Sequence, residues 1–554
     1  MKHQPTGPRG RVWHWAAVLL AVLLLNIPLT VHNVWPTPAV HWTGELSVEL
    51  AALLLVLSVS NAAGWRTPRP VLVGLSLLMV LFGLGRYAEV TAPALYGREV
   101  NLYWDVPQLG AVAGMLVRVA SPWIVTAIVV GAVVVLALLY LMARWSWGRI
   151  DAVLHARRGA RLGFGLVAAV LVVCYLVQQI SDSVPRLPRF SIPVSQTYAT
   201  QIGRFAAAFS GRAARSLPPS PPLQSSLATL GGSDVLLVFM ESYGRSTYDR
   251  PEFQQALVAS RARLDAAIRD THRGVVSAFV TSPTFSSGSV LAHLSLLSGV
   301  EVRDPDHYAA LMMQRRPTLV STFKSAGYRT LAVMPGLRDP WPEGAFYGFD
   351  HIYGADGLDY HGPAFGWWRI PDQFSLAALD ARELRPRPRQ PLFVFFPTVS
   401  THMPFEPVPP LQADWQRILS PQPFDAGPLH DSLLQTPVWT DLGRAYTHSV
   451  NYFTDVLANW LRARGDEQFV LIVLGDHQPA ASVSGEGASW DVPVHVIASQ
   501  PAILEALQAD GFRPGLEPAP SAAGPMSKLG PWLLAAFGKP TAAQAQAPAA
   551  ADVR

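Results

Sequence analysis

The stretch Phe469-Val-Leu-Ile-Val-Leu-Gly-Asp-His-Gln478 decides the fold class, because an apolar run there ends on an acid and an imidazole. Five of its first six residues are branched aliphatics, which predicts a central strand buried on both faces of a parallel or mixed sheet. Asp476 and His477 follow where such a strand emerges. Ligands of open α/β sheets bind outside the carboxyl ends of strands, and an Asp-His pair can supply two ligands to one metal ion. A plain Gly-Asp-His turn is the alternative.

Two other apolar runs end on residues that can bind a metal or act in catalysis. The run 234–240 ends on Glu241, and the run 391–397 leads to Thr401 and His402. From residue 234 onward, such runs alternate with amphipathic helical patterns, which predicts an α/β sandwich with a mainly parallel central sheet. If the three strands are parallel neighbours, their ends meet in one crevice.

Residues 281–299 form a hydroxyl-rich loop that leads into a helix beginning near Ser289 and closing at Gly299. The N-terminus of a helix directs free backbone N–H groups and a partial positive charge toward an anion. A serine at that position, beside a metal, can be deprotonated and attack phosphorus. An ordinary N-cap serine is the alternative interpretation.

The first third of the chain predicts a membrane part. Five apolar stretches have roughly the length needed to cross a bilayer, namely 13–31, 45–62, 70–87, 122–143 and 162–180. The first is not a cleaved signal peptide, because further spans follow it and no small-residue cleavage site ends it. Arginines concentrate before the first span, between the second and third, and between the fourth and fifth. This places the N-terminus in the cytoplasm and the rest of the chain after the last span outside a bacterial inner membrane, in the periplasm or beyond.

The predicted domain plan has four parts. Residues 1–182 form a transmembrane domain with five helices, and residues 183–232 form a juxtamembrane connector stiffened by prolines. Residues 233–539 form the catalytic domain. Residues 540–554, rich in Ala, Pro and Gln, predict a disordered tail.

Composition excludes some classes of function. The formal net charge is a modest +4, and no basic stripe with interleaved aromatic residues occurs, so nucleic acid is not an expected partner. The single cysteine, Cys174, rules out an internal disulfide framework and a cysteine-based zinc site.

The order of the motifs resembles the alkaline phosphatase and sulfatase superfamily. The elements that carry the resemblance are Glu241 after the first strand, the pattern Ser289-x8-Ser-Gly299, Ser400-Thr-His-Met-Pro-Phe405 and Gly475-Asp-His477. With five preceding spans, the chain is similar to the membrane-anchored phosphotransferases of that superfamily: lipoteichoic acid synthases, lipid A phosphoethanolamine transferases and the phosphoglycerol transferases of periplasmic glucans.

The resemblance implies a set of site residues. Glu241, Asp476, His477 and Ser289 would be metal ligands, Ser289 would also be the nucleophile, and His402 would contact the leaving group or the phosphoryl oxygens. Two carboxylates, an imidazole and an alkoxide suit one divalent metal, with Zn²⁺ preferred and Mn²⁺ or Mg²⁺ as alternatives. Such a metal lowers the pKa of the nucleophile and neutralises phosphoryl charge.

Two departures from the family pattern bear on the nucleophile. The phosphotransferases usually carry Thr where this chain has Ser, and Ser286 and Ser287 are close enough to compete. Ser289 is preferred because its distance to Ser298-Gly299 fits the family. Sulfatases proper require a Cys/Ser-x-Pro-x-Arg motif for formylglycine formation, and Ser289-Val-Leu-Ala-His293 has neither that Pro nor that Arg.

Several further residues are secondary candidates. His293 lies one helical turn after Ser289 and is a candidate acid or base, with a solvated or packed histidine as the alternative. Trp367 or Trp368 and Arg369 are candidates for stacking on a headgroup and gripping phosphate, with a buried Trp and a surface Arg as the alternative. His495 is either a second metal-site histidine or, preferably, a core histidine.

The predicted function is metal-dependent transfer of a phosphoryl-linked headgroup. A membrane phospholipid in the bilayer would donate phosphoethanolamine or glycerol phosphate through a phospho-Ser289 intermediate, and an envelope lipid or glycan would accept it. The alternatives are a hydrolase of phosphate or sulfate esters on the same scaffold and a non-catalytic membrane scaffold.

Overall fold

The computed structural model describes residues 8–119, 122–180, 187–209, 217–366 and 368–538. The predicted tail 540–554 and Trp367 lie outside these residues. The chain divides into two compact units, Met1–Ser210 and Gly211–Arg554, which are described separately below.

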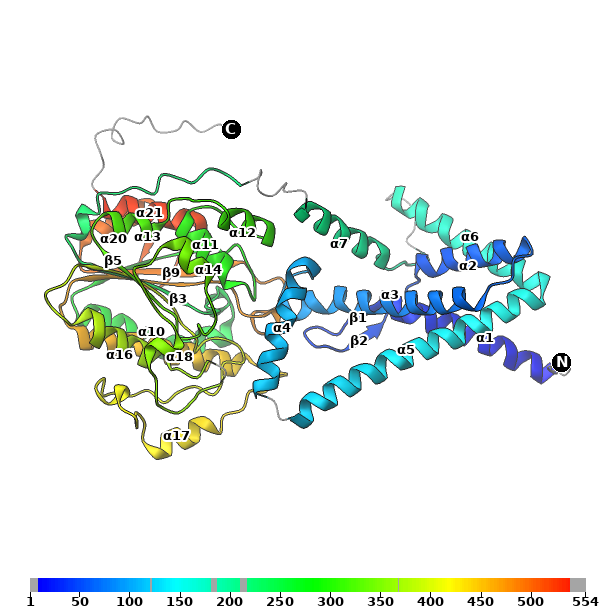
Figure 1. The fold of residues 1–554 in the computed structure, drawn as a ribbon, viewed down its shortest axis with the longest axis horizontal. Coiled ribbons are helices and arrows are strands. Elements are labelled where there is room, and N and C mark those ends of the chain that lie inside the picture. The colour runs from blue at the N-terminus through cyan, green and yellow to red at the C-terminus, as the bar shows by residue number, and fades with distance from the viewer. Residues whose placement is uncertain (1–7, 120–121, 181–186, 210–216, 367, 539–554) are drawn as a thin grey trace. The chain divides into compact units, whose positions relative to one another are not determined.

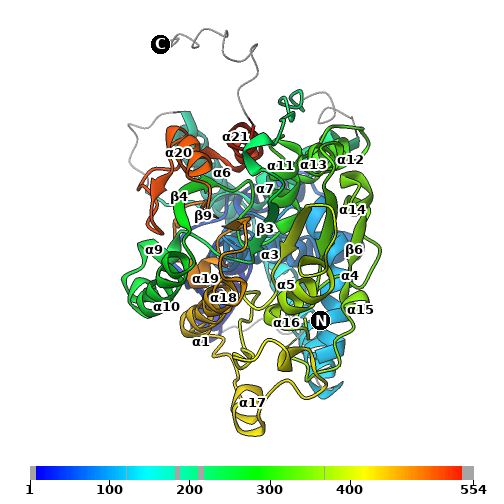
Figure 2. The same cartoon turned by 90° about the vertical axis from the view of Figure 1, so that its left-hand side faces the viewer.

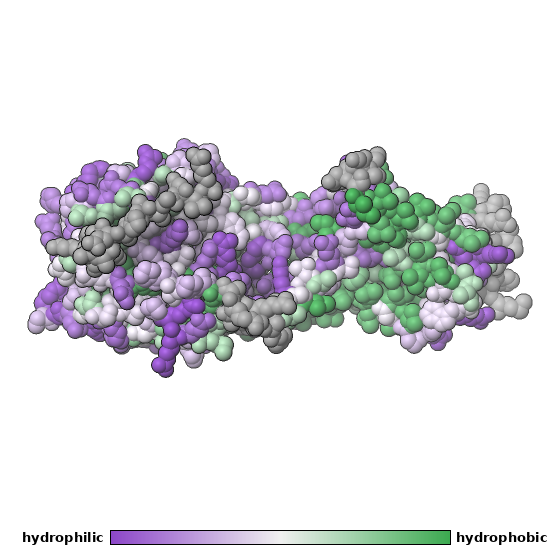
Figure 3. Space-filling view, turned by 90° about the horizontal axis from the view of Figure 1, so that it is seen from above, coloured by the Kyte–Doolittle hydropathy of each residue, from purple (hydrophilic) through white to green (hydrophobic). Residues whose placement is uncertain are grey.

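The first unit consists mainly of long apolar helices. Its elements are α1 (Pro8–Thr30), β1 (Val31–Asn33), β2 (Val40–Trp42), α2 (Val48–Ala62), α3 (Arg69–Tyr96), α4 (Leu102–Val119), α5 (Pro122–Ala156), α6 (Arg158–Ile180) and α7 (Val194–Phe209). Residues of α1, α2, α3, α5 and α6 share one apolar core. Many apolar side chains of these helices also face outward, and Figure 3 shows hydrophobic residues gathered on this unit. Such an exterior is typical of helices surrounded by lipid.

The prediction of five long spans is wrong in one place. Within the described residues, four helices are long and apolar enough to cross a membrane: Val12–Thr30, Arg69–Tyr96, Pro122–Ala156 and Arg158–Ile180. The predicted span 45–62 contains only the 15-residue helix α2. The Ser47 side chain caps that helix by accepting from Leu50 N at 3.2 Å, so the helix begins at Val48. Its length of about 22 Å is shorter than a hydrocarbon core of about 30 Å.

Both ends of α2 nevertheless contact α6 or the segment that follows it. At one end, Leu46 N donates to Arg189 O at 3.0 Å and Ser191 N donates to Leu46 O at 3.1 Å. At the other end, the Arg161 guanidinium donates to Asn61 O at 3.0 Å. The short helix therefore packs beside α6, and the residue before its cap is joined to the segment that follows the longer helix.

The second unit is built on one nine-stranded sheet, with order β10-β4-β9-β8-β3-β7-β5-β6 and β11 beside β4. Its strands are β3 (Asp234–Met240), β4 (Gly274–Thr281), β5 (Arg329–Val333), β6 (His351–Tyr353), β7 (Leu392–Pro397), β8 (Phe469–Gly475), β9 (Asp491–Ala498), β10 (Arg513–Pro514) and β11 (Gly524–Pro525). The neighbours β8, β3, β7, β5 and β6 are parallel. The strands β9, β4 and β10 each pair antiparallel with the preceding one along that edge, so the sheet is mixed and mainly parallel, as predicted.

Helices cover both faces of this sheet. They are α9 (Ser246–Asp249), α10 (Pro251–Asp270), α11 (Ser289–Ser298), α12 (Pro305–Met312), α13 (Leu319–Ser325), α14 (Pro342–Tyr347), α15 (Ala355–Leu358), α16 (Asp372–Leu379), α17 (Ala426–Leu433), α18 (Gly443–Arg464), α19 (Ala481–Ser484), α20 (Pro501–Ala509) and α21 (Leu529–Phe537). Residues of α10, α16 and α18 pack on one face, and residues of α11, α13, α20 and α21 pack on the other (Figures 1 and 2).

The alternation of side chains along β3 explains why both faces are covered. Leu236, Val238 and Met240 belong to one apolar core, whereas Val235, Leu237 and Phe239 belong to the other. Successive residues of a strand point to opposite faces, so a run that is apolar at every position needs a layer on each side.

The strand register sets the position of the candidate residues. Met240 of β3 pairs with Gly475 of β8, so Glu241 and Asp476 leave the sheet side by side. Phe239 pairs with Pro397 at the end of β7, which brings the segment containing His402 to the same edge.

Candidate active site

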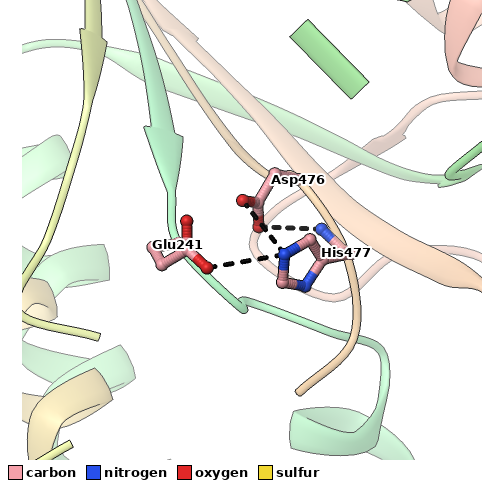
Figure 4. Close-up of side chains that lie close together, drawn as sticks. All are labelled: Glu241, Asp476 and His477. Carbon is pink, nitrogen blue, oxygen red and sulfur yellow. Dashed lines mark hydrogen bonds and ion pairs between the residues drawn. The ribbon is translucent and has the colours of Figure 1, made fainter. Parts of the chain in front are cut away.

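Glu241, Asp476 and His477 form a tight cluster at the carboxyl ends of β3 and β8. Their candidate ligand atoms all lie within 4.8 Å of one another. His477 Nε2 is 3.5 Å from Glu241 Oε1 and 3.6 Å from Asp476 Oδ2, and the three side chains point toward one another in Figure 4. Asp476 and His477 are almost fully buried, and the Glu241 side chain is 11% exposed.

The two oxygens of Asp476 have different partners. Oδ1 accepts from Ser242 N and from His477 N, each at 2.8 Å, and so ties the loop after β3 to the loop after β8. Oδ2 is buried and has no hydrogen-bond donor among the described residues. One oxygen therefore holds the two loops together while the other faces the cluster.

The electrostatics of the cluster favour a cation. Burial, together with the neighbouring Glu241 carboxylate, raises the pKa of Asp476 to about 6. Burial works against protonation of His477, but Asp476 and Glu241 outweigh it and raise the pKa of that imidazole. Its Nδ1–H donates to Gln478 O at 2.8 Å, which directs Nε2 toward the two carboxylates.

These residues fit a divalent metal. The buried Asp476 Oδ2 has no donor among the described residues, two carboxylates share a largely buried site, and the imidazole presents a lone pair to them. A buried carboxylate without a partner is costly, and a bound cation removes that cost. Carboxylate oxygens with one imidazole nitrogen suit Zn²⁺ or Mn²⁺.

Ser289 lies against this cluster. It is the first residue of α11, after Gly288, whose φ of 81° turns the chain into the helix. Its Oγ donates to Glu241 Oε2 at 3.2 Å and lies 3.3 Å from His477 Nε2. The side chain is half-buried, so a substrate can reach it.

The competing serines make other contacts. Ser286 has a φ of 63°, and its backbone N donates to Gln478 O at 3.1 Å. The carbonyl of Ser287 accepts from Thr284 Oγ1. Of the three serines, Ser289 is the one whose hydroxyl contacts both Glu241 and His477 in the described part of the chain.

His402 follows β7 and faces the same edge of the sheet. Its Nδ1–H donates to Met403 O at 2.7 Å, which leaves Nε2 as an acceptor. Burial lowers the pKa of this imidazole, so the ring is neutral near pH 7. Trp368 packs edge-on against it with ring centroids 4.9 Å apart.

His293 sits inside the apolar layer next to the site. The structure packs it between Phe239 and Phe395, at ring distances of 4.4 and 5.2 Å, and leaves it 8% exposed. Burial lowers its pKa to about 4, which keeps the ring neutral. It is outside the cluster of Glu241, Asp476 and His477, and this environment favours the packed alternative.

Two other sequence candidates lie away from the cluster. Arg369 is exposed, with a φ of 64°, and no contact within the described residues joins its guanidinium to Glu241, Asp476 or His477. His495 lies in β9, where its Nδ1 is 2.6 Å from Ser277 Oγ and its Nε2 is 3.2 Å from the Tyr243 hydroxyl. His495 is therefore part of a buried polar network in the core, as the preferred interpretation expects.

Residues that support the cluster have no clear signal in the sequence. Thr398 Oγ1 accepts from Glu241 N at 3.1 Å, and Ser282 Oγ donates to Asp476 O at 2.6 Å. The buried Tyr446 hydroxyl donates to Ser242 O at 2.8 Å and accepts from Gly244 N at 3.4 Å. Their roles depend on contacts between segments that are far apart in the chain.

The fold and the cluster define an α/β enzyme with two carboxylates, an imidazole and a serine at the carboxyl edge of parallel strands. A profile of the family described as Sulfatase matches residues 233–511, about half of the chain, and the chain belongs to this family within the alkaline phosphatase and sulfatase superfamily. No curated protein matches the sequence.

Solved structures with a similar fold have low sequence identity. A protein of the alkaline phosphatase superfamily from Vibrio parahaemolyticus is 16% identical, with a TM-score of 0.32; 51% of this chain and 63% of that one are covered. The lipoteichoic acid synthase LtaP from Listeria monocytogenes is 15% identical (TM-score 0.34; 60% and 80% covered). The C-terminal periplasmic domain of EptC from Escherichia coli is also 15% identical (TM-score 0.34; 51% and 77% covered).

Proposed function

We propose that this chain transfers a phosphoryl-linked headgroup from a membrane phospholipid to a hydroxyl of an envelope lipid or glycan. The observation that carries the proposal is the position of Ser289 Oγ, 3.2 Å from Glu241 Oε2 and 3.3 Å from His477 Nε2 at the first turn of α11. A hydroxyl so placed is a nucleophile with an acidic and imidazole cluster beside it.

Glu241, Asp476, His477 and Ser289 would hold one divalent cation, preferably Zn²⁺. Such a cation lowers the pKa of the serine hydroxyl and offsets charge on the phosphoryl oxygens. The chain itself positions the nucleophile: Gly288 allows the turn, and α11 directs its free N–H groups toward the phosphoryl group.

The transfer proceeds in two balanced halves. Ser289 Oγ forms a bond to phosphorus while the bond from phosphorus to the diacylglycerol oxygen breaks, and the serine proton ends on diacylglycerol. An acceptor hydroxyl then attacks phospho-Ser289, and its proton returns to the serine. His402, neutral and with Nε2 free, relays these protons between the leaving and entering oxygens.

A donor in the bilayer agrees with the apolar helices of the first unit. Four of them are long enough to cross a membrane, and the shorter α2 packs beside α6. A catalytic unit on the outer side of that membrane would meet both the phospholipid donor and the envelope acceptor.

The experiment compares Ser289→Ala with the wild type in the full-length protein reconstituted with labelled phospholipid. We expect Ser289→Ala to abolish diacylglycerol release and covalent labelling of the protein, with an unchanged midpoint of thermal unfolding. Ser287→Ala is the matched control and should retain both signals, because the described contact of that residue uses its carbonyl.

Two outcomes would contradict the proposal. Undiminished diacylglycerol release by Ser289→Ala would exclude this nucleophile. Product formation at one rate with and without a glycan or lipid acceptor would identify a hydrolase instead of a transferase.

A further inference from the structure

A pocket adjoins the candidate active site and shares His402 with it. Its volume is about 390 Å³, including the part that is open to solvent. The residues that line it include Trp368, Val399, Phe405, Glu406 and Pro407. Thr398 Oγ1 accepts from Glu241 N at 3.1 Å and lies 3.4 Å from Thr401 Oγ1, so the segment that carries His402 adjoins the site. A group attached to a phosphorus atom at Ser289 can therefore enter the pocket past His402.

The pocket carries one acidic side chain in an otherwise uncharged lining. Glu406 is the only Asp, Glu, Lys or Arg among its thirteen described lining residues, and most of the others are apolar or proline. Arg369, the nearest arginine in sequence to Trp368, is not among them. The lining thus offers a small cationic group one acidic partner and no competing cation.

Glu406 is buried more deeply than its ion pair explains. Its side chain is 14% exposed, and its only ion partner in the described residues is His448 Nδ1 at 3.7 Å. That histidine is 47% exposed, so solvent screens the pair. Burying a carboxylate with such a weak partner is unfavourable unless a cation from outside the chain joins it.

Trp368 lies in the same lining, against the His402 ring, and supplies complementary features. Its indole Nε1 is buried and has no acceptor among the described residues. An indole N–H is a donor only, so it is satisfied by an oxygen of a ligand. The ring face of a tryptophan also attracts an alkylammonium group.

We propose that this pocket binds the ammonium end of a phosphoethanolamine headgroup. This inference rests on the proposed headgroup transfer and narrows its substrate class to zwitterionic phospholipids. The ammonium group lies at Glu406, and an oxygen of the headgroup accepts from Trp368 Nε1. A glycerol phosphate headgroup has hydroxyls for both positions but no positive charge for the carboxylate.

Binding to the full-length, Zn²⁺-supplemented protein in detergent tests this pocket separately from turnover. Titration calorimetry would compare O-phosphoethanolamine with sn-glycerol 1-phosphate. We expect the wild type to bind O-phosphoethanolamine about tenfold more tightly, and Glu406→Gln to lose that preference. His448→Gln is the matched control: it removes the surface partner, keeps the carboxylate, and should retain the preference.

Equal affinity of the wild type for the two compounds would overturn the inference, and so would an unchanged preference in Glu406→Gln. Loss of the preference in His448→Gln as well would assign the effect to the ion pair and not to the pocket, which also overturns it. Failure of the proposed transfer gives a different pattern: selective binding of O-phosphoethanolamine without diacylglycerol release from either phospholipid.

Discussion

Gly475 is the position at which the structure predicts the sharpest effect of a single methyl group. A Cβ built on Gly475 would lie 1.9 Å from Tyr243 O and 2.8 Å from Tyr243 C. Real Cβ atoms essentially never come closer than 3.0 Å to another heavy atom, so Gly475→Ala requires the two backbones to separate by about 1 Å. Tyr243 follows Glu241 by two residues, and Gly475 immediately precedes Asp476, so this movement separates the residues of the cluster.

We expect two effects of Gly475→Ala. Overpacking at a buried strand end lowers the free energy of unfolding by about 1–3 kcal/mol. Displacement of the ligands by about 1 Å lowers Zn²⁺ affinity by about 10–100-fold and the rate of phosphodiester cleavage by about 100-fold.

The assay is a competition titration of Zn²⁺ against a chromophoric chelator, with thermal unfolding and cleavage of bis(p-nitrophenyl) phosphate measured on the same samples. Gly427→Ala is the matched control. Gly427 lies in α17, and a Cβ there meets nothing within 4 Å, so we expect no loss of metal affinity and a slight gain in stability. If Gly475→Ala binds Zn²⁺ and cleaves the substrate as well as the wild type does, the close approach of the two loops is not what positions the site.

Two further predictions concern buried side chains beside the site. Burial raises the pKa of Asp372 to about 6 from 3.8, so its contribution to stability is complete below about pH 4 and is lost as the pH rises through 6. The wild type should therefore lose up to about 3 kcal/mol relative to Asp372→Asn between pH 4 and pH 7 in denaturant titrations; a constant difference would contradict this pKa. Tyr446→Phe leaves Ser242 O and Gly244 N without their partner, so we expect a loss of about 1–3 kcal/mol in unfolding free energy and weaker Zn²⁺ binding in the chelator competition. Unchanged Zn²⁺ affinity would show that this hydroxyl does not position the Glu241 loop.

Local patterns in the sequence predict much of the catalytic unit. The runs 234–240, 391–397 and 469–474 are apolar at nearly every position, and the structure makes them neighbouring parallel strands of one sheet. Their polar endings therefore meet, which is how Glu241 and Asp476 could be paired from the sequence. Short-range composition predicts that these strands are buried, whereas their order in the sheet was a condition of the prediction, and the pairing of β3 with β7 and β8 meets that condition.

Other features depend on contacts that a linear pattern does not contain. The apolar stretch 45–62 has enough residues for a span, yet the cap at Ser47 fixes the start of the helix and shortens it to 15 residues. His293 has the spacing of a catalytic partner of Ser289, but Phe239 and Phe395 from two strands enclose it. From the sequence alone, Glu406 is indistinguishable from an exposed glutamate in a proline-rich loop, and only the structure shows that it is buried in the pocket.

The two oxygens of the Asp476 carboxylate have different roles in the site. Asp476 Oδ1 accepts from Ser242 N and His477 N, so Asp476 helps Thr398 and Tyr446 to hold the loop that carries Glu241. Oδ2 remains free of donors and faces His477 Nε2 at 3.6 Å. A cation at that position would therefore bind a carboxylate that already anchors both loops, and its binding energy would act on the position of Glu241 as well as on Asp476. Because Ser289 Oγ contacts Glu241 Oε2, the same linkage would reach the proposed nucleophile, and metal binding would also affect the position of Ser289 Oγ.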